Sequence, residues 1–381
     1  MYSDFISLIK DTYPGKKIIN LHEPKFIGNE KKYLEESINS SYVSSVGPFV
    51  NDFENKLAAY LNIKNVILTT NGTSALHIAL KLAGAKEETE VITQSLTFVA
   101  TSNAIHYCNA NPVFIDVDKS TLGLSASALE NFLNKNCYLD NEGKCWNKKT
   151  KRKIVACLPM HTYGFPVEII KIKEICDNYN INLVEDVAEG MGSYYKDIHL
   201  GTFGKLGTLS FNGNKIITSG NGGAIVTNDD ELAKKAKHLT TTARKKHKWH
   251  IDHDEIGYNY RMSNISAAVG LAQLESLDYF IDKKRSLALK YQLFGSKNDL
   301  SFFKENDNSK ANYWLNVLIA SDKKERDLIL ETTNENNIMT RPAWTPMHML
   351  PMNNKCEHDS MENTEFLFDR IINVPSSVTD V

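Results

Sequence analysis

Between residues 66 and 186 the chain alternates strand-like and helix-like segments, and this alternation limits its possible folds more than any other feature. Such alternation predicts a mainly parallel sheet that is covered by helices on both faces. Ligands of such sheets bind beyond the carboxyl ends of the strands, so we expect functional side chains there. The strand-like runs are 66–70, 90–93, 112–116, 153–158 and 182–185, and the segments with helical spacing are 74–83, 98–106, 127–133 and 169–179.

The chain has 381 residues, enough for two domains. We expect residues 1–249 to form a large domain with an N-terminal entry segment, and residues 250–381 to form a smaller α+β domain. The polar, lysine-rich insert at 134–152 predicts a surface hairpin. Further elements are expected as helices at 30–39, 53–61, 265–278, 280–296 and 327–336, and as a strand at 311–319.

Charge and composition are those of an ordinary globular protein. The net charge of -2 gives no overall field that would favour nucleic acid or an anionic membrane surface. Two basic runs, at 234–237 and 244–250, are either a solvated helix face and loop or a surface that attracts a small polyanion. No recognised nucleic-acid-binding module accompanies these runs, so no nucleic-acid partner is predicted.

Cysteine usage and the absence of long apolar runs predict a cytoplasmic protein. None of the six cysteines forms a Cys-x-x-Cys pair, so we expect reduced thiols and no metal site. The first ten residues are too charged and too short for a signal peptide. No apolar run reaches the length of a membrane span, so no membrane insertion is expected.

Lys215 follows the strand-like run 206–211 and precedes a glycine-rich turn at 220–223. Asp186 follows the strand-like run 182–185. A lysine that forms a Schiff base, and an acidic group that pairs with a pyridine nitrogen, are what a pyridoxal phosphate (PLP) site requires. The alternatives are a solvated surface lysine and an aspartate that caps the next helix.

Polar residues at two further strand ends suit the phosphate of such a cofactor. Asn71-Gly-Thr73-Ser74 opens the predicted helix at 74–83, where free backbone N–H groups and hydroxyls face an anion. Thr73 or Ser74 could instead be a simple helix cap. Ser210 precedes Lys215 by five residues, so one turn could bring both to the same cofactor, although Ser210 could also be an ordinary strand residue.

Six motifs resemble those of the DegT/StrS nucleotide-sugar aminotransferases, which are PLP enzymes of fold type I with the aspartate aminotransferase fold. The motifs occur in the family's order and span most of the chain. They are Asn71-Gly-Thr-Ser-Ala-Leu76, Thr97-Phe-Val-Ala-Thr101, Glu185-Asp186, Ser210-Phe-x-x-x-Lys215, Gly220-x-Gly-Gly223 and Gly257-Tyr-Asn-Tyr-Arg-Met262.

The resemblance implies a role for individual residues. Lys215 would hold PLP and then move protons, and Asp186 would pair with the pyridine nitrogen. Phe98 would stack on the ring, although an aromatic residue can also be simple core packing. Thr73, Ser74 and Ser210 would bind the phosphate. Asn259 would reach the cofactor of a neighbouring subunit, which implies a homodimer with active sites at the interface, although it could also be a turn residue.

Glu189 departs from the commonest pattern, because many relatives carry glutamine or histidine three residues after the aspartate. The resemblance still implies a cofactor contact, near the phenolic oxygen. A carboxylate that faces a phenolate must be protonated to donate a hydrogen bond, or the two groups repel each other. The protonation state of Glu189 is therefore open at this point.

The segments 21–24 and 42–50 resemble a branch that acts on UDP-linked 2-acetamido-2,6-dideoxy-4-keto hexoses. The implied reaction moves the amino group of L-glutamate to C4 of the sugar, on a route to surface polysaccharide such as O-antigen. Arg341 can meet a diphosphate, Trp344 can stack on a base or sugar, and His348 can bind a phosphate or hydroxyl. Each of the three could equally be structural.

Other functions remain to be weighed against this one. The same chemistry on a GDP- or dTDP-linked keto sugar is the first alternative. Related dehydratases carry histidine in place of the lysine, so Lys215 argues against that reaction. A silent PLP or sugar-nucleotide sensor would need no turnover, yet the catalytic set is complete. A nicotinamide oxidoreductase lacks its glycine fingerprint here.

Overall fold

The computed structural model describes residues 2–379 and contains a central sheet in the order β1, β11, β10, β7, β6, β2, β3 and β16. Neighbours from β10 to β16 are parallel, whereas β11 pairs antiparallel with both β10 and β1. The predicted mainly parallel sheet is confirmed, and the antiparallel β11 was not predicted. These strands span, in the same order, Asn65–Thr69, Gly223–Thr227, Leu206–Ser210, Asn182–Asp186, Lys153–Leu158, Thr89–Gln94, Asn111–Ile115 and Glu357–His358.

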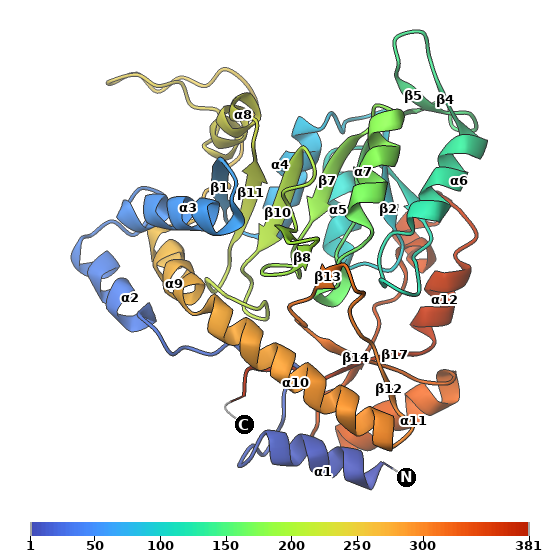
Figure 1. The fold of residues 1–381 in the computed structure, drawn as a ribbon. Coiled ribbons are helices and arrows are strands. Elements are labelled where there is room, and N and C mark those ends of the chain that lie inside the picture. Colours follow the sequence, from blue (N-terminus) through green and yellow to red (C-terminus); the bar gives the residue numbers. More distant parts are fainter. Residues whose placement is uncertain (1, 380–381) are drawn as a thin grey trace.

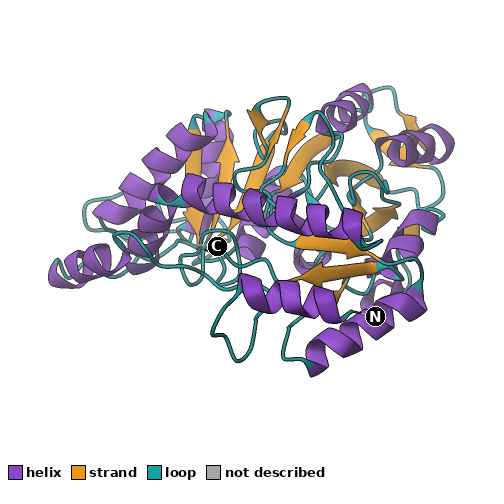
Figure 2. Ribbon diagram, turned by 60° about the horizontal axis from the view of Figure 1, so that its bottom comes forward, coloured by secondary structure: helices purple, strands orange, loops and turns teal. Residues whose placement is uncertain are grey.

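Helices cover both faces of this sheet (Figure 2). Successive strand residues point to opposite faces, so Val91 packs with one apolar cluster and Ile92 with another. The first cluster includes α4 and α5, and the second includes α6 and α7. Both faces are therefore buried, as a parallel sheet requires. These helices span Gly72–Leu82, Val99–Tyr107, Ala126–Asn136 and Ile169–Asn178.

A smaller antiparallel sheet, in the order β12, β14, β17 and β15, forms in the C-terminal part (Figure 1). The predicted hairpin at 134–152 is confirmed as β4 and β5. The remaining strands span Ser301–Phe302 (β12), Asn316–Ile319 (β14), Ile371–Val374 (β17), Arg341–Pro342 (β15), Cys137–Leu139 (β4), Cys145–Asn147 (β5), Tyr194–Tyr195 (β8), Ile198–His199 (β9) and Ser309–Lys310 (β13).

The other helices connect these layers, and within residues 2–379 none is both long and apolar enough to cross a membrane. The predicted helix at 30–39 is confirmed residue for residue as α2. The helices are Ser3–Thr12 (α1), Glu30–Asn39 (α2), Pro48–Leu61 (α3), Asp230–Thr240 (α8), Asn264–Glu275 (α9), Leu277–Lys297 (α10), Lys323–Glu335 (α11) and Glu362–Phe368 (α12), with 3-10 turns at Thr162–Gly164, Met347–Met349 and Pro351–Asn353.

The N-terminal helix α1 packs against the C-terminal part of the chain. Phe5 and Ile9 are buried in one apolar cluster with Tyr291 and Phe302. Figure 1 shows α1 beside α10 and α11. The division of the chain at residue 249 stays a prediction, and α1 makes its core contacts beyond that position.

Lys284 lies in α10 with its side chain fully buried. Its Nζ donates to the backbone oxygens of Trp314, at 3.0 Å, and Ser376. Burial lowers the pKa of Lys284 from 10.5 to about 7, because no carboxylate compensates for the lost hydration. The ammonium thus joins the long helix to the segment before β14 and the segment after β17.

We expect stability to rise with pH above neutrality because of Lys284. Between about pH 7 and 10.5 the unfolded chain holds a proton that the folded protein has released, so raising the pH favours folding. The slope from one proton is ~1.4 kcal/mol per pH unit. The free energy of unfolding, measured with urea at several pH values in this range, should rise less steeply with pH for Lys284→Met than for the wild type. Lys297→Met, which changes an exposed lysine of the same helix, should keep the wild-type slope. Equal slopes for Lys284→Met and the wild type would contradict this account.

Candidate active site

Lys215 lies in a closed loop that follows β10. The backbone N–H of Lys215 donates to the oxygen of Asn212 at 3.0 Å, and Ser219 N–H donates to the oxygen of Phe211 at 2.9 Å. The side chain is 11% exposed, and its Nζ lies 4.3 Å from the centre of the Trp314 ring. The loop therefore directs the lysine inward, and Lys215 is not a solvated surface residue.

Asp186 ends β7, and its carboxylate is buried beside the same loop. Oδ2 accepts from the Thr101 hydroxyl at 2.8 Å, and Oδ1 accepts from the N–H of Ala188 at 3.1 Å. Burial raises the pKa of Asp186, and these two hydrogen bonds oppose the rise, as do the charges of Lys215 and His161. A positively charged group against this carboxylate would offset the remaining cost of burial.

Glu189 joins the Lys215 loop to the turn that contains Tyr163. Its Oε1 lies 3.2 Å from Lys215 Nζ, and its Oε2 accepts from the N–H of Tyr163 at 2.8 Å. Burial raises the pKa of Glu189 from 4.5 to about 7, with the charge of Lys215 as the main opposing influence. Both charge states of Glu189 are thus accessible near neutral pH.

The N-terminus of α4 lies directly against the end of β10. Asn71 caps the helix by accepting from the N–H of Ser74 at 2.8 Å, so the cap is neither Thr73 nor Ser74. A Cβ on Gly72 would lie only 2.8 Å from Cβ of Ser210, so glycine permits this close approach. Thr73, Ser74 and Ser210 are thereby gathered at a helix N-terminus, which suits an anion.

Phe98 and Trp344, which come from distant segments, meet in one aromatic cluster. The ring centres of Phe98 and Trp344 lie 5.9 Å apart. The ring centre of Tyr163 lies 4.9 Å from that of Trp344, so Trp344 contacts both rings. Phe98 is 46% exposed, so it is not simple core packing. Trp344 and Arg341 also line a cavity of about 590 Å³, together with Trp314. The cavity therefore adjoins the side chain that contacts Lys215.

His348 and Asn259 lie apart from this cavity lining. The ring of His348 is bonded to the Ser95 hydroxyl at 2.7 Å, and its Nε2 lies 3.6 Å from a Glu365 oxygen. Asn259 is exposed and forms a backbone bridge with Thr241. The structure thus brings together Lys215, Asp186 and Glu189, and it gathers Thr73, Ser74 and Ser210 in a second group. His348 and Asn259 lie outside both groups.

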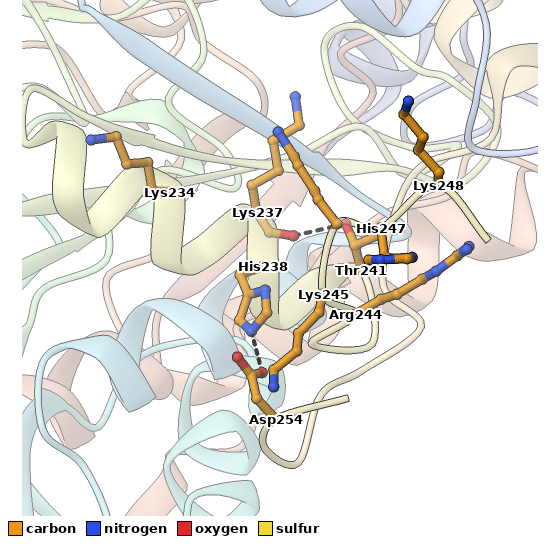
Figure 3. Close-up of a pocket in the computed structure, with 10 residues that line it drawn as sticks. Lys234, Lys237, His238, Thr241, Arg244, Lys245, His247, Lys248 and Asp254 are labelled. Carbon is orange, nitrogen blue, oxygen red and sulfur yellow. Dashed lines mark hydrogen bonds and ion pairs between the residues drawn. The ribbon is translucent and has the colours of Figure 1, made fainter. Parts of the chain in front are cut away.

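A second cavity, of about 1040 Å³, is a basic cleft formed by α8 and the segment that follows it (Figure 3). Lys237, Arg244, Lys245, Lys246 and Lys248 line it. Asp254, the one acidic residue drawn in Figure 3, pairs with His238. Oδ1 of Asp254 lies 2.7 Å from Nε2 of His238. Both basic runs of the sequence therefore meet on one surface, which fits attraction of a polyanion.

Three contributors to the site carried no sequence signal that assigned them a role. Thr101 orients Asp186, Trp314 contacts Lys215, and Tyr163 binds Glu189 through its backbone. Thr101 ends one of the quoted motifs, so its position seven residues after the end of β2 at Gln94 could have been noticed. The other two act through a ring face and a backbone N–H, which no local pattern reveals.

Glu189 should make the cofactor-free protein less stable as the pH rises from about 4.5 to 7. In this range the folded protein keeps a proton that the unfolded chain releases, so raising the pH favours unfolding by up to ~1.4 kcal/mol per pH unit. Glu189→Gln keeps the size of the side chain and one acceptor oxygen and removes the titration, so its unfolding free energy should vary less with pH. Exposed Glu87→Gln is the matched control. The same pH dependence in Glu189→Gln and the wild type would refute the assignment.

The chain is similar to known sugar aminotransferases in sequence. It is 38% identical over 363 residues to the GDP-perosamine synthase of Escherichia coli O157:H7, covering 94% of this chain and 93% of that protein. It is 35% identical over 253 residues to the UDP-4-amino-4,6-dideoxy-N-acetyl-beta-L-altrosamine transaminase of Campylobacter jejuni serotype O:23/36, covering 66% and 63% of the two chains.

A solved structure and a family-wide sequence comparison point to the same group of enzymes as these relatives. The Helicobacter pylori aminotransferase PseC, solved as an enzyme of pseudoaminic acid biosynthesis, superimposes with a TM-score of 0.84 at 24% identity, covering 94% of each chain. This likeness shows the fold, including the predicted type I architecture. The model of the DegT/DnrJ/EryC1/StrS aminotransferase family, whose members depend on PLP, matches residues 24–379. The chain therefore belongs to the DegT/DnrJ/EryC1/StrS aminotransferase family.

Proposed function

We propose that this aminotransferase binds PLP and moves the amino group of L-glutamate to C4 of a nucleotide-linked 4-keto-6-deoxy sugar. The observation that carries the proposal is the cluster of Lys215, Asp186 and Glu189 at the strand ends, beside a cavity of about 590 Å³. A buried lysine and a buried carboxylate in one cleft are unusual without a ligand that uses them.

The residues present fit PLP. The buried Asp186 carboxylate has hydrogen bonds on both oxygens and needs a cationic partner, which a protonated pyridine nitrogen provides. The close approach of Gly72 to Ser210 forms a cradle for the phosphate at the start of α4. When bound, PLP supplies an electron sink for the charge left by removal of a proton from carbon.

Lys215 then performs the proton transfers through its Nζ. Trp314 and Glu189 hold this atom in place, with Glu189 close enough to exchange a hydrogen bond as its charge changes. Phe98 is partly exposed and contacts Trp344, so it can cover a cofactor ring. Trp344 and Arg341 line the adjoining cavity, where a sugar or base and a diphosphate can bind.

Two nucleotide forms of the acceptor have support. A GDP-linked 4-keto-6-deoxyhexose is supported by the full-length similarity to a GDP-perosamine synthase. A UDP-linked 2-acetamido-2,6-dideoxy-4-keto hexose is supported by the motifs near the N-terminus and by the shorter match to a UDP-sugar transaminase. The product in either case would supply a cytoplasmic route to surface polysaccharide.

We also propose a homodimer in which Asn259 completes the site of the neighbouring copy. The segment after α8 projects from the body of the molecule (Figure 1). Trp249, Ile251 and Ile256 in this segment are 72%, 67% and 80% exposed. Large apolar side chains on a projecting segment are typical of a protein interface. Asn259 lies at the base of this segment and is available to such a neighbour.

The half-reaction with glutamate tests the proposed function. The protein with added PLP should show a visible absorbance band that L-glutamate removes, with release of about one equivalent of 2-oxoglutarate per site. Lys215→Ala should release none, because the base is missing, while its circular dichroism spectrum stays that of the wild type. Transamination by Lys215→Ala would refute the assignment. Return of the band with a GDP-linked or a UDP-linked keto sugar then identifies the acceptor.

Subunit complementation tests the shared site. Lys215→Ala and Asn259→Ala homodimers should each be impaired, because each site then lacks one of its two contributors. Mixed subunits should recover about a quarter of wild-type turnover, since half of the dimers are hybrids with one complete site. No recovery in hybrids that are verified by mass spectrometry would place Asn259 outside the neighbour's site.

A further inference from the structure

Three buried polar groups near Lys215 have no hydrogen-bond partner among the described residues. They are both ring nitrogens of His22, the Oδ1 atom of Asn373 and the hydroxyl of Tyr163. Buried polar groups are nearly always hydrogen-bonded, because an unpaired one loses its hydration without compensation. Three such groups in one region indicate a place where a polar ligand completes the bonding.

These groups converge on one cavity from three parts of the chain. His22 and Asn373 line the cavity of about 590 Å³ together with Trp344, and Tyr163 packs against that tryptophan. The side-chain amide of Asn373 also faces the Tyr163 hydroxyl, without completing a hydrogen bond. The unpaired atoms therefore lie at or behind the wall of a space that adjoins Lys215.

The rest of the wall suits a sugar ring. The Trp314 and Trp344 side chains both line the cavity, and an indole face packs well against the apolar face of a pyranose. A pocket with mostly apolar walls and a few placed polar groups is typical of a site for a small ligand. The contact of Trp314 with Lys215 ties this wall to the reacting amine.

The three groups are neutral, which favours hydroxyl groups over a carboxylate or diphosphate as their partners. Burial lowers the pKa of His22 well below its ordinary value, the charges of Lys284 and Lys215 lower it further, and an interaction with the backbone of Asn214 only partly opposes this. Burial raises the pKa of the Tyr163 hydroxyl, so this group stays protonated. A neutral imidazole, a phenol and an amide oxygen together offer both donors and acceptors, as sugar hydroxyls require.

We propose that His22, Asn373 and Tyr163 bind the hydroxyl groups of the hexose ring and thereby select which keto sugar is accepted. The proposal rests on the proposed function, because the ring belongs to the nucleotide-linked keto sugar. These are positioning and specificity residues. The proton transfers remain with Lys215.

The test measures binding of two probes to the PLP-loaded protein by titration calorimetry, without an amino donor, so that no turnover occurs. One probe is the keto sugar nucleotide that restores the visible band, and the other is the matching nucleoside diphosphate alone. His22→Phe, Asn373→Leu and Tyr163→Phe should each weaken binding of the keto sugar about 3- to 10-fold, the loss expected for one hydrogen bond. Binding of the nucleoside diphosphate should stay as in the wild type.

Two further measurements separate ligand binding from a structural role. His22→Gln keeps a polar group at this position and should recover part of the affinity that His22→Phe loses. The melting temperatures of His22→Phe and Tyr163→Phe without ligand should equal or exceed that of the wild type, because the removed polar atoms have no protein partner. A lower melting temperature, or equal loss of affinity for both probes, would overturn the proposal.

Failure of the proposed function would give a different result. In that case neither a GDP-linked nor a UDP-linked keto sugar would bind the wild-type protein or restore its visible band. If the wild type binds a keto sugar and all three variants bind it equally well, the function stands and the assignment of these residues is wrong.

Discussion

Burial of charge at the ends of parallel strands is the constraint on which the rest of the site depends. Asp186 and Glu189 are both removed from water, and their carboxyl groups are tolerated only because fixed donors surround them. Asp186 accepts hydrogen bonds from the Thr101 hydroxyl and the N–H of Ala188. Glu189 accepts from Lys215 Nζ and the N–H of Tyr163. The loops after β7 and β10 therefore have to meet, and this meeting creates the cleft.

Local patterns predicted the parts of the fold that depend on short-range order. The strand at 153–158 and the helix at 30–39 match the structure residue for residue, because periodic apolar positions report which face is buried. Asp186 and Lys215 could be placed together because both follow strands of one parallel sheet. Their burial and their shared contact with Glu189 were beyond the reach of such patterns.

Long-range packing accounts for what the sequence did not predict. The pairing of β11 antiparallel to β10 and β1 depends on a chain reversal that alternation does not encode. The packing of α1 against α10 depends on contacts between segments more than 250 residues apart. The buried position of Lys284 depends on backbone oxygens 30 and 92 residues further along the chain. A buried lysine and a surface lysine look alike in a sequence, because only the surrounding carbonyl groups distinguish them.

The site divides its two tasks between different parts of the fold. The proposed chemistry uses strand ends of the central sheet, where Asp186 and Lys215 are fixed by backbone hydrogen bonds. The cavity wall comes from the N-terminal segment and the small sheet, through His22 and Asn373. With the proposed sugar site there, substitutions in that wall would change which sugar fits without moving the strand ends. This separation gives a physical reason why one family can apply the same amino transfer to differently substituted sugars.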